Sequence, residues 1–133
     1  MSYSLDIYYG KLKPTKDFIS FAAFVSFFPQ LVAGPIERAS NLLPQILKNR
    51  LFKYDDGIKS IRQIIWGLFK KIVIADNCAQ YANLIFNNFM DYNSSALILG
   101  LLFFSFQIYC DFSGYSDIAI GVSRLLGFEL MLN

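Results

Sequence analysis

Two uncharged stretches of 19 residues each, residues 18–36 and 92–110, limit what this chain of 133 residues can fold into. A membrane-spanning helix needs about 20 consecutive apolar residues, so each stretch has nearly the length required to cross a bilayer. Neither stretch is uniformly apolar, because the first contains Pro29, Gly34 and Pro35 and the second begins with polar residues. The sequence therefore predicts membrane helices that are interrupted.

The composition agrees with a membrane class. Hydrophobic residues make up 55% and charged residues 17% of the chain, against about 45–50% and about 25% in typical soluble domains. The net charge of +2 gives no reason to expect a nucleic-acid partner. Histidine is absent, which removes the commonest general base and metal ligand. Cys78 and Cys110 match no zinc or redox spacing, so we expect no metal site and no bound cofactor.

The distribution of charge predicts an orientation in the membrane. Residues 37–71 contain eight Lys or Arg and three acidic residues, whereas residues 72–123 contain no Lys or Arg and four Asp. Positive residues near membrane spans tend to remain cytoplasmic. We expect the basic segment on the cytoplasmic side and the turn at residues 91–93 on the opposite side.

Apolar spacing and capping residues predict a helical chain. We expect an all-α, polytopic membrane-protein fragment with two to four hydrophobic or interfacial helices and broken or re-entrant segments. The expected helices are 15–28 with Thr15 as N-cap, 40–47 capped by Ser40 and Asn41, 58–75, 96–109 capped by residues 93–95, and an apolar stretch from Ile118.

The predicted helix at residues 58–75 is amphipathic, with isoleucines on one side and basic residues with Trp66 on the other. Lys70 and Lys71 would each cost about 2.5–3.5 kcal/mol at the centre of a bilayer. The helix is therefore expected at the membrane interface or shielded by partners. A soluble surface helix is the alternative.

The first candidate region is the sequence PQLVAGPIER, which contains Pro29, Gly34, Pro35 and Arg38. Prolines and a glycine break a helix, and broken backbone at membrane depth is tolerated only where protein or a water-filled cavity surrounds it. One interpretation is a re-entrant or cavity-lining loop. The other is a helix that ends at the interface before a cytoplasmic loop.

The second candidate region contains Asp111, Ser113, Tyr115 and Asp117, with Gly114 between them. A carboxylate beside a membrane segment marks a polar cavity or a paired charge by default. These side chains are candidates for binding a polar substrate. Alternatively, Asp111 or Ser113 caps the helix that follows. No serine or cysteine has a histidine to activate it, so no catalytic residue is assigned.

Three segments carry a family resemblance: residues 21–38 (FAAFVSFFPQLVAGPIER), 67–77 (GLFKKIVIADN) and 106–128 (FQIYCDFSGYSDIAIGVSRLLGF). In this order they resemble blocks of the membrane-bound O-acyltransferase family. The resemblance is greatest to the bacterial branch that acetylates alginate and other cell-wall or secreted polysaccharides. It implies a multi-pass helical enzyme of the cell membrane that transfers an acyl group, here acetyl, to a polysaccharide.

The resemblance also implies what the chain lacks. Residues 1–133 match a middle segment of the family's domain, and the family's catalytic histidine lies after the block that contains Asp117. We therefore expect the chain to be inactive alone. The implied acyl donor is acyl-CoA or an acyl-carrier protein. The implied partners are the lipid bilayer, the remainder of the acyltransferase, and periplasmic or extracellular acetylation proteins.

The basic helix leaves a second function open. A basic amphipathic helix with Trp66 is also typical of a small interaction protein that lies on an anionic membrane surface. Release from membranes by salt would favour that alternative, because salt screens surface attraction.

Overall fold

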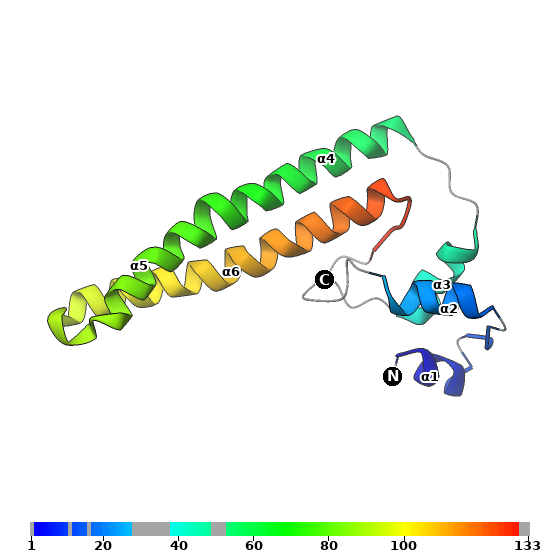
Figure 1. The fold of residues 1–133 in the computed structure, drawn as a ribbon, viewed down its shortest axis with the longest axis horizontal. Helices are drawn as coiled ribbons and strands as arrows, with labels where there is room; N and C mark the ends of the chain where they lie inside the picture. The colour runs from blue at the N-terminus through cyan, green and yellow to red at the C-terminus, as the bar shows by residue number, and fades with distance from the viewer. Residues whose placement is uncertain (1, 11, 16, 28–37, 49–52, 131–133) are drawn as a thin grey trace. The chain divides into compact units, whose positions relative to one another are not determined.

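A computed structural model describes residues 2–10, 12–15, 17–27, 38–48 and 53–130. Its secondary structure within these ranges is helical and contains no strand, which confirms the all-α fold class. The chain divides into two compact units (Figure 1). One consists of Met1–Ile61 with Ala119–Asn133, and the other of Arg62–Ile118.

The first unit begins with α1 (Ser2–Tyr8) and α2 (Phe18–Val25). The N-cap of α2 is Asp17, whose carboxylate accepts a hydrogen bond from the backbone N–H of Ile19 at 3.0 Å. The prediction of Thr15 as N-cap is wrong, because Thr15 lies too far before the first helical turn. Its hydroxyl accepts instead from the backbone N–H of Asp17 at 3.2 Å.

The next helix, α3, spans Ala39–Leu47, close to the predicted range. The predicted cap is wrong: the N-cap position is Arg38, without a side-chain hydrogen bond. Ser40 lies inside the helix, and its backbone N–H donates to the carboxylate of Asp6 at 3.2 Å. Pro44 is also inside α3, beyond the first turn where proline is normally tolerated, and cannot donate a backbone hydrogen bond.

The core of this unit is formed by Phe24, Phe27, Ala39, Leu42, Leu43 and Phe128. The rings of Phe27 and Phe128 meet edge to face with centroids 5.0 Å apart. Gln45 of α3 bonds to the segment that follows α6 (Ser94–Leu125). Its side-chain amide donates to the carbonyl of Glu129 at 3.0 Å and accepts from the N–H of Glu129 at 2.8 Å. Aromatic packing and two hydrogen bonds between the Gln45 side chain and the Glu129 backbone thus attach the segment after α6 to the rest of this unit.

The second unit, which we call the hairpin (residues 62–118), is built from two long helical arms. Its first arm runs from the last part of α4 (Tyr54–Leu68), beginning at Arg62, through a π-helical segment, η2 (Phe69–Ala75), into α5 (Asp76–Asn87). A 3-10 turn, η3 (Phe89–Asp91), leads to the second arm, α6 (Figure 1). The helix predicted at residues 58–75 is therefore part of a longer helical arm, and its π segment was not predicted.

The second arm, α6, is one continuous helix of 32 residues, Ser94–Leu125. Asn93 caps it as predicted, because its side-chain oxygen accepts from the backbone N–H of Ala96 at 3.0 Å. The predicted end near Tyr109 and the separate stretch from Ile118 are wrong, since the helix continues through both. At 1.5 Å per residue α6 is about 48 Å long, more than the roughly 30 Å of a bilayer core. Among the described helices, α6 alone has the length and apolar composition of a membrane span.

The two arms of the hairpin lie side by side in opposite directions. Near the turn, the ring of Tyr81 stacks on Phe103 with centroids 5.4 Å apart. A Cβ on Gly100 would lie 2.9 Å from the side chain of Ile85, so α5 and α6 approach closely there. The outward apolar side chains of α6, such as Phe106, are exposed, as expected for a helix that contacts lipid or further protein.

Candidate functional site

The polar residues of the hairpin gather where η2 faces α6. They form a group that we call the lysine–carboxylate cluster: Gln63, Lys70, Lys71, Asp76, Asp111, Ser113 and Asp117. It joins the GLFKKIVIADN and CDFSGYSD segments, which are more than 30 residues apart in the sequence.

Lys70 is the more enclosed of the two lysines. Its ammonium group forms an ion pair with Asp117 and donates a hydrogen bond to the hydroxyl of Ser113 at 2.7 Å. The amide of Gln63 donates to the other carboxylate oxygen of Asp117 at 3.2 Å. The Lys70 and Asp117 side chains are only 15% and 22% exposed, so each charge depends on the other for stabilisation.

Lys71 forms a second, more exposed bridge. Its ammonium group lies 2.8 Å from the carboxylates of both Asp76 and Asp111. The side chains involved are 43–54% exposed, so water weakens these pairs. Lys71 therefore links its own helical arm to α6, with less effect on stability than Lys70.

The π-helical segment η2 explains how two successive lysines reach the same neighbouring helix. Successive side chains of a regular α-helix point about 100° apart. In η2 the hydrogen bonds run over five residues, as in the bond from the N–H of Asp76 to the carbonyl of Lys71. The wider turn also brings the side chains of Lys71 and Asp76 together. Such π segments are frequent at functional sites.

Two glycines allow the arms to meet beside the cluster. A Cβ on Gly67 would lie 2.6 Å from the carbonyl oxygen of Gly114, and a Cβ on Gly114 would lie 2.8 Å from the carbonyl oxygen of Gly67. Real Cβ atoms do not approach backbone so closely, so only glycine fits either position in this packing. This close approach keeps Lys70 within reach of α6.

The charged groups of the cluster are all engaged in ion pairs. Two lysines are paired with three carboxylates, and no carboxylate of the cluster is without a cationic neighbour. Within the described ranges, no group of His, Cys, Asp or Glu side chains is arranged to hold a metal ion. The side-chain oxygen of Gln107, one turn before Asp111 on α6, is buried without a hydrogen-bond partner among the described residues. The cluster can orient the helices and supply fixed charges.

The structure brings together three of the four side chains predicted in the second region: Asp111, Ser113 and Asp117. Tyr115 is partly buried on the same helix, and its hydroxyl makes no hydrogen bond within the part of the chain that is described. The capping alternative is wrong, because α6 continues through this region and its polar side chains bond across to the neighbouring arm. Binding of a substrate by these four residues stays a prediction.

The first region is only partly described. Arg38 is exposed at the start of α3. Pro29, Gly34 and Pro35 lie outside the described residues, so the re-entrant loop stays a prediction.

Sequence reasoning missed the lysines and Gln63 as members of the site. The cost of placing Lys70 and Lys71 at the centre of a bilayer was recognisable, and so was the cost of Asp111 and Asp117 beside a membrane segment. Both costs fall when opposite charges pair. Two lysines on one helix and two carboxylates on another therefore indicated ion pairs between the two helices. Gln63 had no comparable indication.

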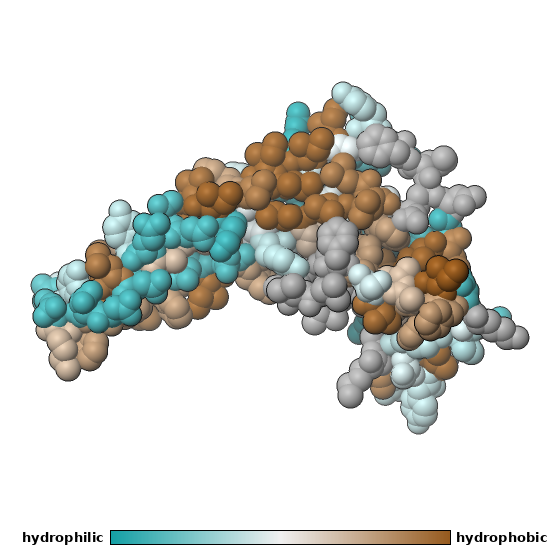
Figure 2. Space-filling model, in the orientation of Figure 1, coloured by the Kyte–Doolittle hydropathy of each residue, from teal (hydrophilic) through white to brown (hydrophobic). Residues whose placement is uncertain are grey.

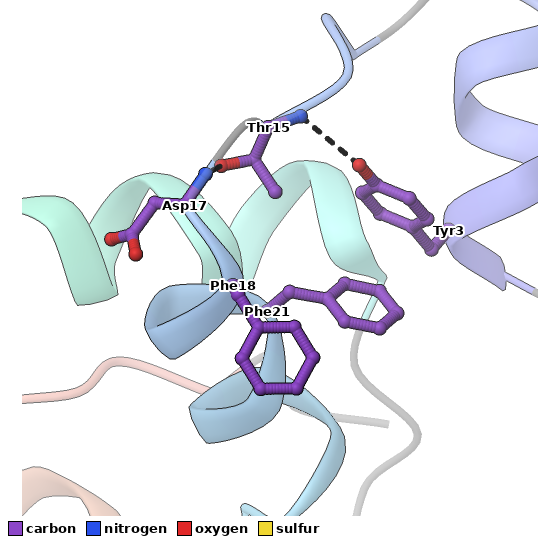
Figure 3. A pocket seen from close by; sticks show the side chains of 5 residues that line it. All are labelled: Tyr3, Thr15, Asp17, Phe18 and Phe21. Atoms are coloured by element: carbon purple, nitrogen blue, oxygen red, sulfur yellow. Dashed lines mark hydrogen bonds between the residues drawn. The ribbon is translucent and has the colours of Figure 1, made fainter.

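A separate pocket of about 260 Å³ lies in the first unit (Figure 3). It is lined by Tyr3, Thr15, Asp17, Phe18 and Phe21. The backbone N–H of Thr15 donates to the hydroxyl of Tyr3 at 3.0 Å. A hydrogen bond from the Ser20 hydroxyl lowers the pKa of Asp17 below its ordinary value. The polar groups of this pocket are thus engaged in hydrogen bonds, and those of Asp17 cap α2.

Comparison with known protein families gives a match over most of the chain. The model of the MBOAT, membrane-bound O-acyltransferase family matches residues 11–131. The chain belongs to this family. The match confirms the resemblance found in the sequence, and favours it over the interaction-protein alternative.

Alignments with individual relatives extend over a similar length of the chain. A protein described as probable alginate O-acetylase AlgI from Pseudomonas putida is 39% identical over 133 residues, which is 100% of this chain and 27% of the relative. A protein with the same description from Azotobacter vinelandii is 38% identical over 133 residues, covering 26% of that relative. A peptidoglycan O-acetyltransferase from Helicobacter pylori is 41% identical over 118 residues, which is 87% of this chain and 22% of the relative.

The chain therefore spans about a quarter of the length of these relatives. Its family is membrane-bound, which agrees with the apolar, exposed helix α6.

Proposed function

We propose that this chain contributes a helical hairpin to a multi-pass cell-membrane enzyme that transfers an acetyl group to a cell-wall or exported polysaccharide. The observation that carries the proposal is the alignment of the whole chain with relatives described as alginate O-acetylases, together with the peptidoglycan O-acetyltransferase. The acyl donor would be acyl-CoA or an acyl-carrier protein, which reaches the basic, cytoplasmic side.

In this proposal the lysine–carboxylate cluster positions the enzyme rather than performing its chemistry. The carboxylates of Asp117 and Asp111 are engaged in ion pairs with Lys70 and Lys71. The chain contains no histidine. We therefore propose that the chain is inactive alone, and that acetyl transfer requires the rest of an acyltransferase, with periplasmic or extracellular acetylation proteins as further partners.

The fixed charges have a physical purpose in such an enzyme. Paired charges inside an apolar hairpin set the register of its two arms, because any slip leaves an unpaired charge in a poorly solvated place. A set register would hold Ser113, Tyr115 and Asp117 in place along a polar passage for the substrate.

A chimeric enzyme tests this proposal. The segment of the Pseudomonas putida relative that aligns with this chain is replaced by the chain's 133 residues, in a strain deleted for its own alginate O-acetylase. Alkali-labile acetate on secreted alginate is then measured, with the chain expressed alone as a second arm. We expect acetylation by the chimera and none by the chain alone.

Two results would contradict the proposal. A chimera that reaches the membrane at the level of the native relative but leaves alginate unacetylated would refute the contribution to acetyl transfer. Acetylation by the chain alone would refute its dependence on the rest of an acyltransferase.

A further inference from the structure

The uncharged part of α6 is too short to cross a bilayer. The hydrocarbon core is about 30 Å thick, which a straight α-helix crosses with about 20 residues. Between the cap at Asn93 and the first carboxylate, Asp111, α6 offers 17 residues, 94–110. Every stretch of about 20 residues within Ser94–Leu125 includes both Asp111 and Ser113. If α6 crosses the bilayer, it therefore carries a carboxylate into it.

The lysines of η2 supply the opposite charge for that carboxylate. An ionised side chain inside a membrane is costly unless it is paired or reaches water. The ammonium group of Lys71 lies 2.8 Å from the carboxylates of Asp111 and Asp76, and Lys70 donates to Ser113 at 2.7 Å. Residues 72–123 contain no Lys or Arg, so α6 has no cation of its own along that length. Its carboxylates depend on the first arm for pairing.

The two arms of the hairpin need each other at the same depth. They stay side by side from the lysines to the turn, where Tyr81 stacks on Phe103 and Gly100 packs against Ile85. Alone, the first arm is too polar to cross, because hydrophilic surface gathers over α5 (Figure 2) and only α6 among the described helices has the composition of a span. The first arm thus supplies the cations, and α6 supplies the apolar length.

The ion pairs of Lys71 depend strongly on what surrounds them. The side chains of Lys71, Asp76 and Asp111 are 43–54% exposed in the hairpin. In detergent solution, water reaches them and weakens the pairs. In a bilayer, the exposed parts meet lipid or further protein instead, and the attraction between opposite charges grows as the surroundings become less polar. Pairs that contribute little to resistance against unfolding can therefore control insertion.

We propose that the hairpin crosses the bilayer as one ion-paired unit, in which Lys71 neutralises Asp111 of α6 inside the membrane. The turn of the hairpin then lies outside the cytoplasm. Of the two positions expected for the basic helix, the inference selects the one in which Lys70 and Lys71 are shielded by a partner, here α6. It rests on the membrane location in the proposed function and not on acetyl transfer.

Labelling of the turn from one side of the membrane tests the inference. The chimera described above provides the protein that the polar face of α5 needs beside it in a membrane. Met90 in η3 is 84% exposed, and Met90→Cys is the reporter in a chimera whose other cysteines are replaced. A membrane-impermeant maleimide is applied to sealed right-side-out vesicles, and again after the vesicles are opened. Comparison of the two signals gives the ratio of chains with the turn outside to chains with the turn inside.

Three variants of the reporter protein separate charge pairing from other effects. Lys71→Met leaves Asp76 and Asp111 without their cation, and we expect the ratio of outside to inside turns to fall about tenfold. Lys71→Met combined with Asp76→Asn and Asp111→Asn removes all three charges and should restore the native ratio. Lys59→Met is the matched control, because it removes an exposed lysine of α4 outside the hairpin, and it should leave the ratio unchanged.

A native turn that is labelled only after the vesicles are opened would overturn the inference. A native ratio in Lys71→Met, an equal fall in Lys59→Met, or a triple variant that stays as low as Lys71→Met would overturn it as well. Acetate measurement on the same chimera separates the two proposals. Outside labelling that depends on Lys71 without acetyl transfer would refute the proposed function alone, and acetyl transfer with a ratio independent of Lys71 would refute this inference alone.

Discussion

Substitution of Gly67 by alanine sets two well-known effects against each other. In the interior of an exposed helix, glycine to alanine stabilises by about 1 kcal/mol, because alanine is the better helix former. In the hairpin, the new Cβ would lie 2.6 Å from the carbonyl oxygen of Gly114 and 2.8 Å from the side chain of Ile118. The sign of the change in unfolding free energy therefore depends on whether the arms meet as described.

The magnitude follows from the distance the arms must move. Ordinary contact begins at 3.4 Å, so the backbone of α6 has to retreat by about 0.8 Å. Overpacking of this kind costs about 1–3 kcal/mol. The same movement stretches the 2.7 Å bond from Lys70 to Ser113, and a hydrogen bond to a charged group contributes about 1.5–3 kcal/mol. After the gain in helix propensity, we expect Gly67→Ala to lower the unfolding free energy by about 1–3 kcal/mol.

Denaturant unfolding in mild detergent, followed by circular dichroism, measures this change. Ser105→Ala is the matched control, since Ser105 is exposed on α6 and bonds only to the carbonyl of Leu101 in its own helix. The control should stay within about 0.5 kcal/mol of the native protein. Stabilisation of the Gly67→Ala protein by about 1 kcal/mol would refute the close approach of the arms.

Three further predictions concern single side chains. Lys71→Met should lower the unfolding free energy by no more than about 1 kcal/mol, because the pairs of Lys71 are well exposed, and the same denaturation experiment checks it. Asn93→Ala removes the cap of α6 and should cost about 1 kcal/mol, seen as faster amide exchange in the first turn of that helix. The pKa of Asp17, lowered by the Ser20 hydroxyl, should be found below the ordinary value of an aspartate in an NMR titration, and Ser20→Ala should raise it. A lowered pKa means that the contribution of Asp17 to stability is complete above the unfolded pKa and is lost as pH falls through the folded pKa.

The length of α6 was underestimated for a physical reason. Asp111, Ser113 and Gly114 are typical of helix ends when only neighbouring residues are considered. In the hairpin, the first two bond to lysines of the other arm, and the glycine gives room for that arm. Contacts between distant segments thus outweighed the local preference for a helix end. Such contacts cannot be inferred from one segment of the sequence alone.

Other features were predictable because they depend on local sequence. The Asn93 cap needs only its own side chain and the next backbone groups, and it is found where expected. The all-α class follows from apolar spacing and composition. The π segment η2 was unpredictable, since its sequence FKKIVIA differs little from that of an ordinary helix and the wider turn is stabilised by pairs across the hairpin.

The pairing of Lys70 with Asp117 is the central claim, and a double-mutant cycle with exchanged charges tests it most directly. Unfolding free energies are measured for Lys70→Asp, Asp117→Lys and the protein that carries both substitutions. If the two side chains form the ion pair described, each single change places like charges together, and the double change restores an attractive pair. We predict that the double variant is more stable than either single variant, with a coupling energy of about 1–3 kcal/mol. Additive effects, within about 0.5 kcal/mol, would contradict the pairing and with it the register of the hairpin.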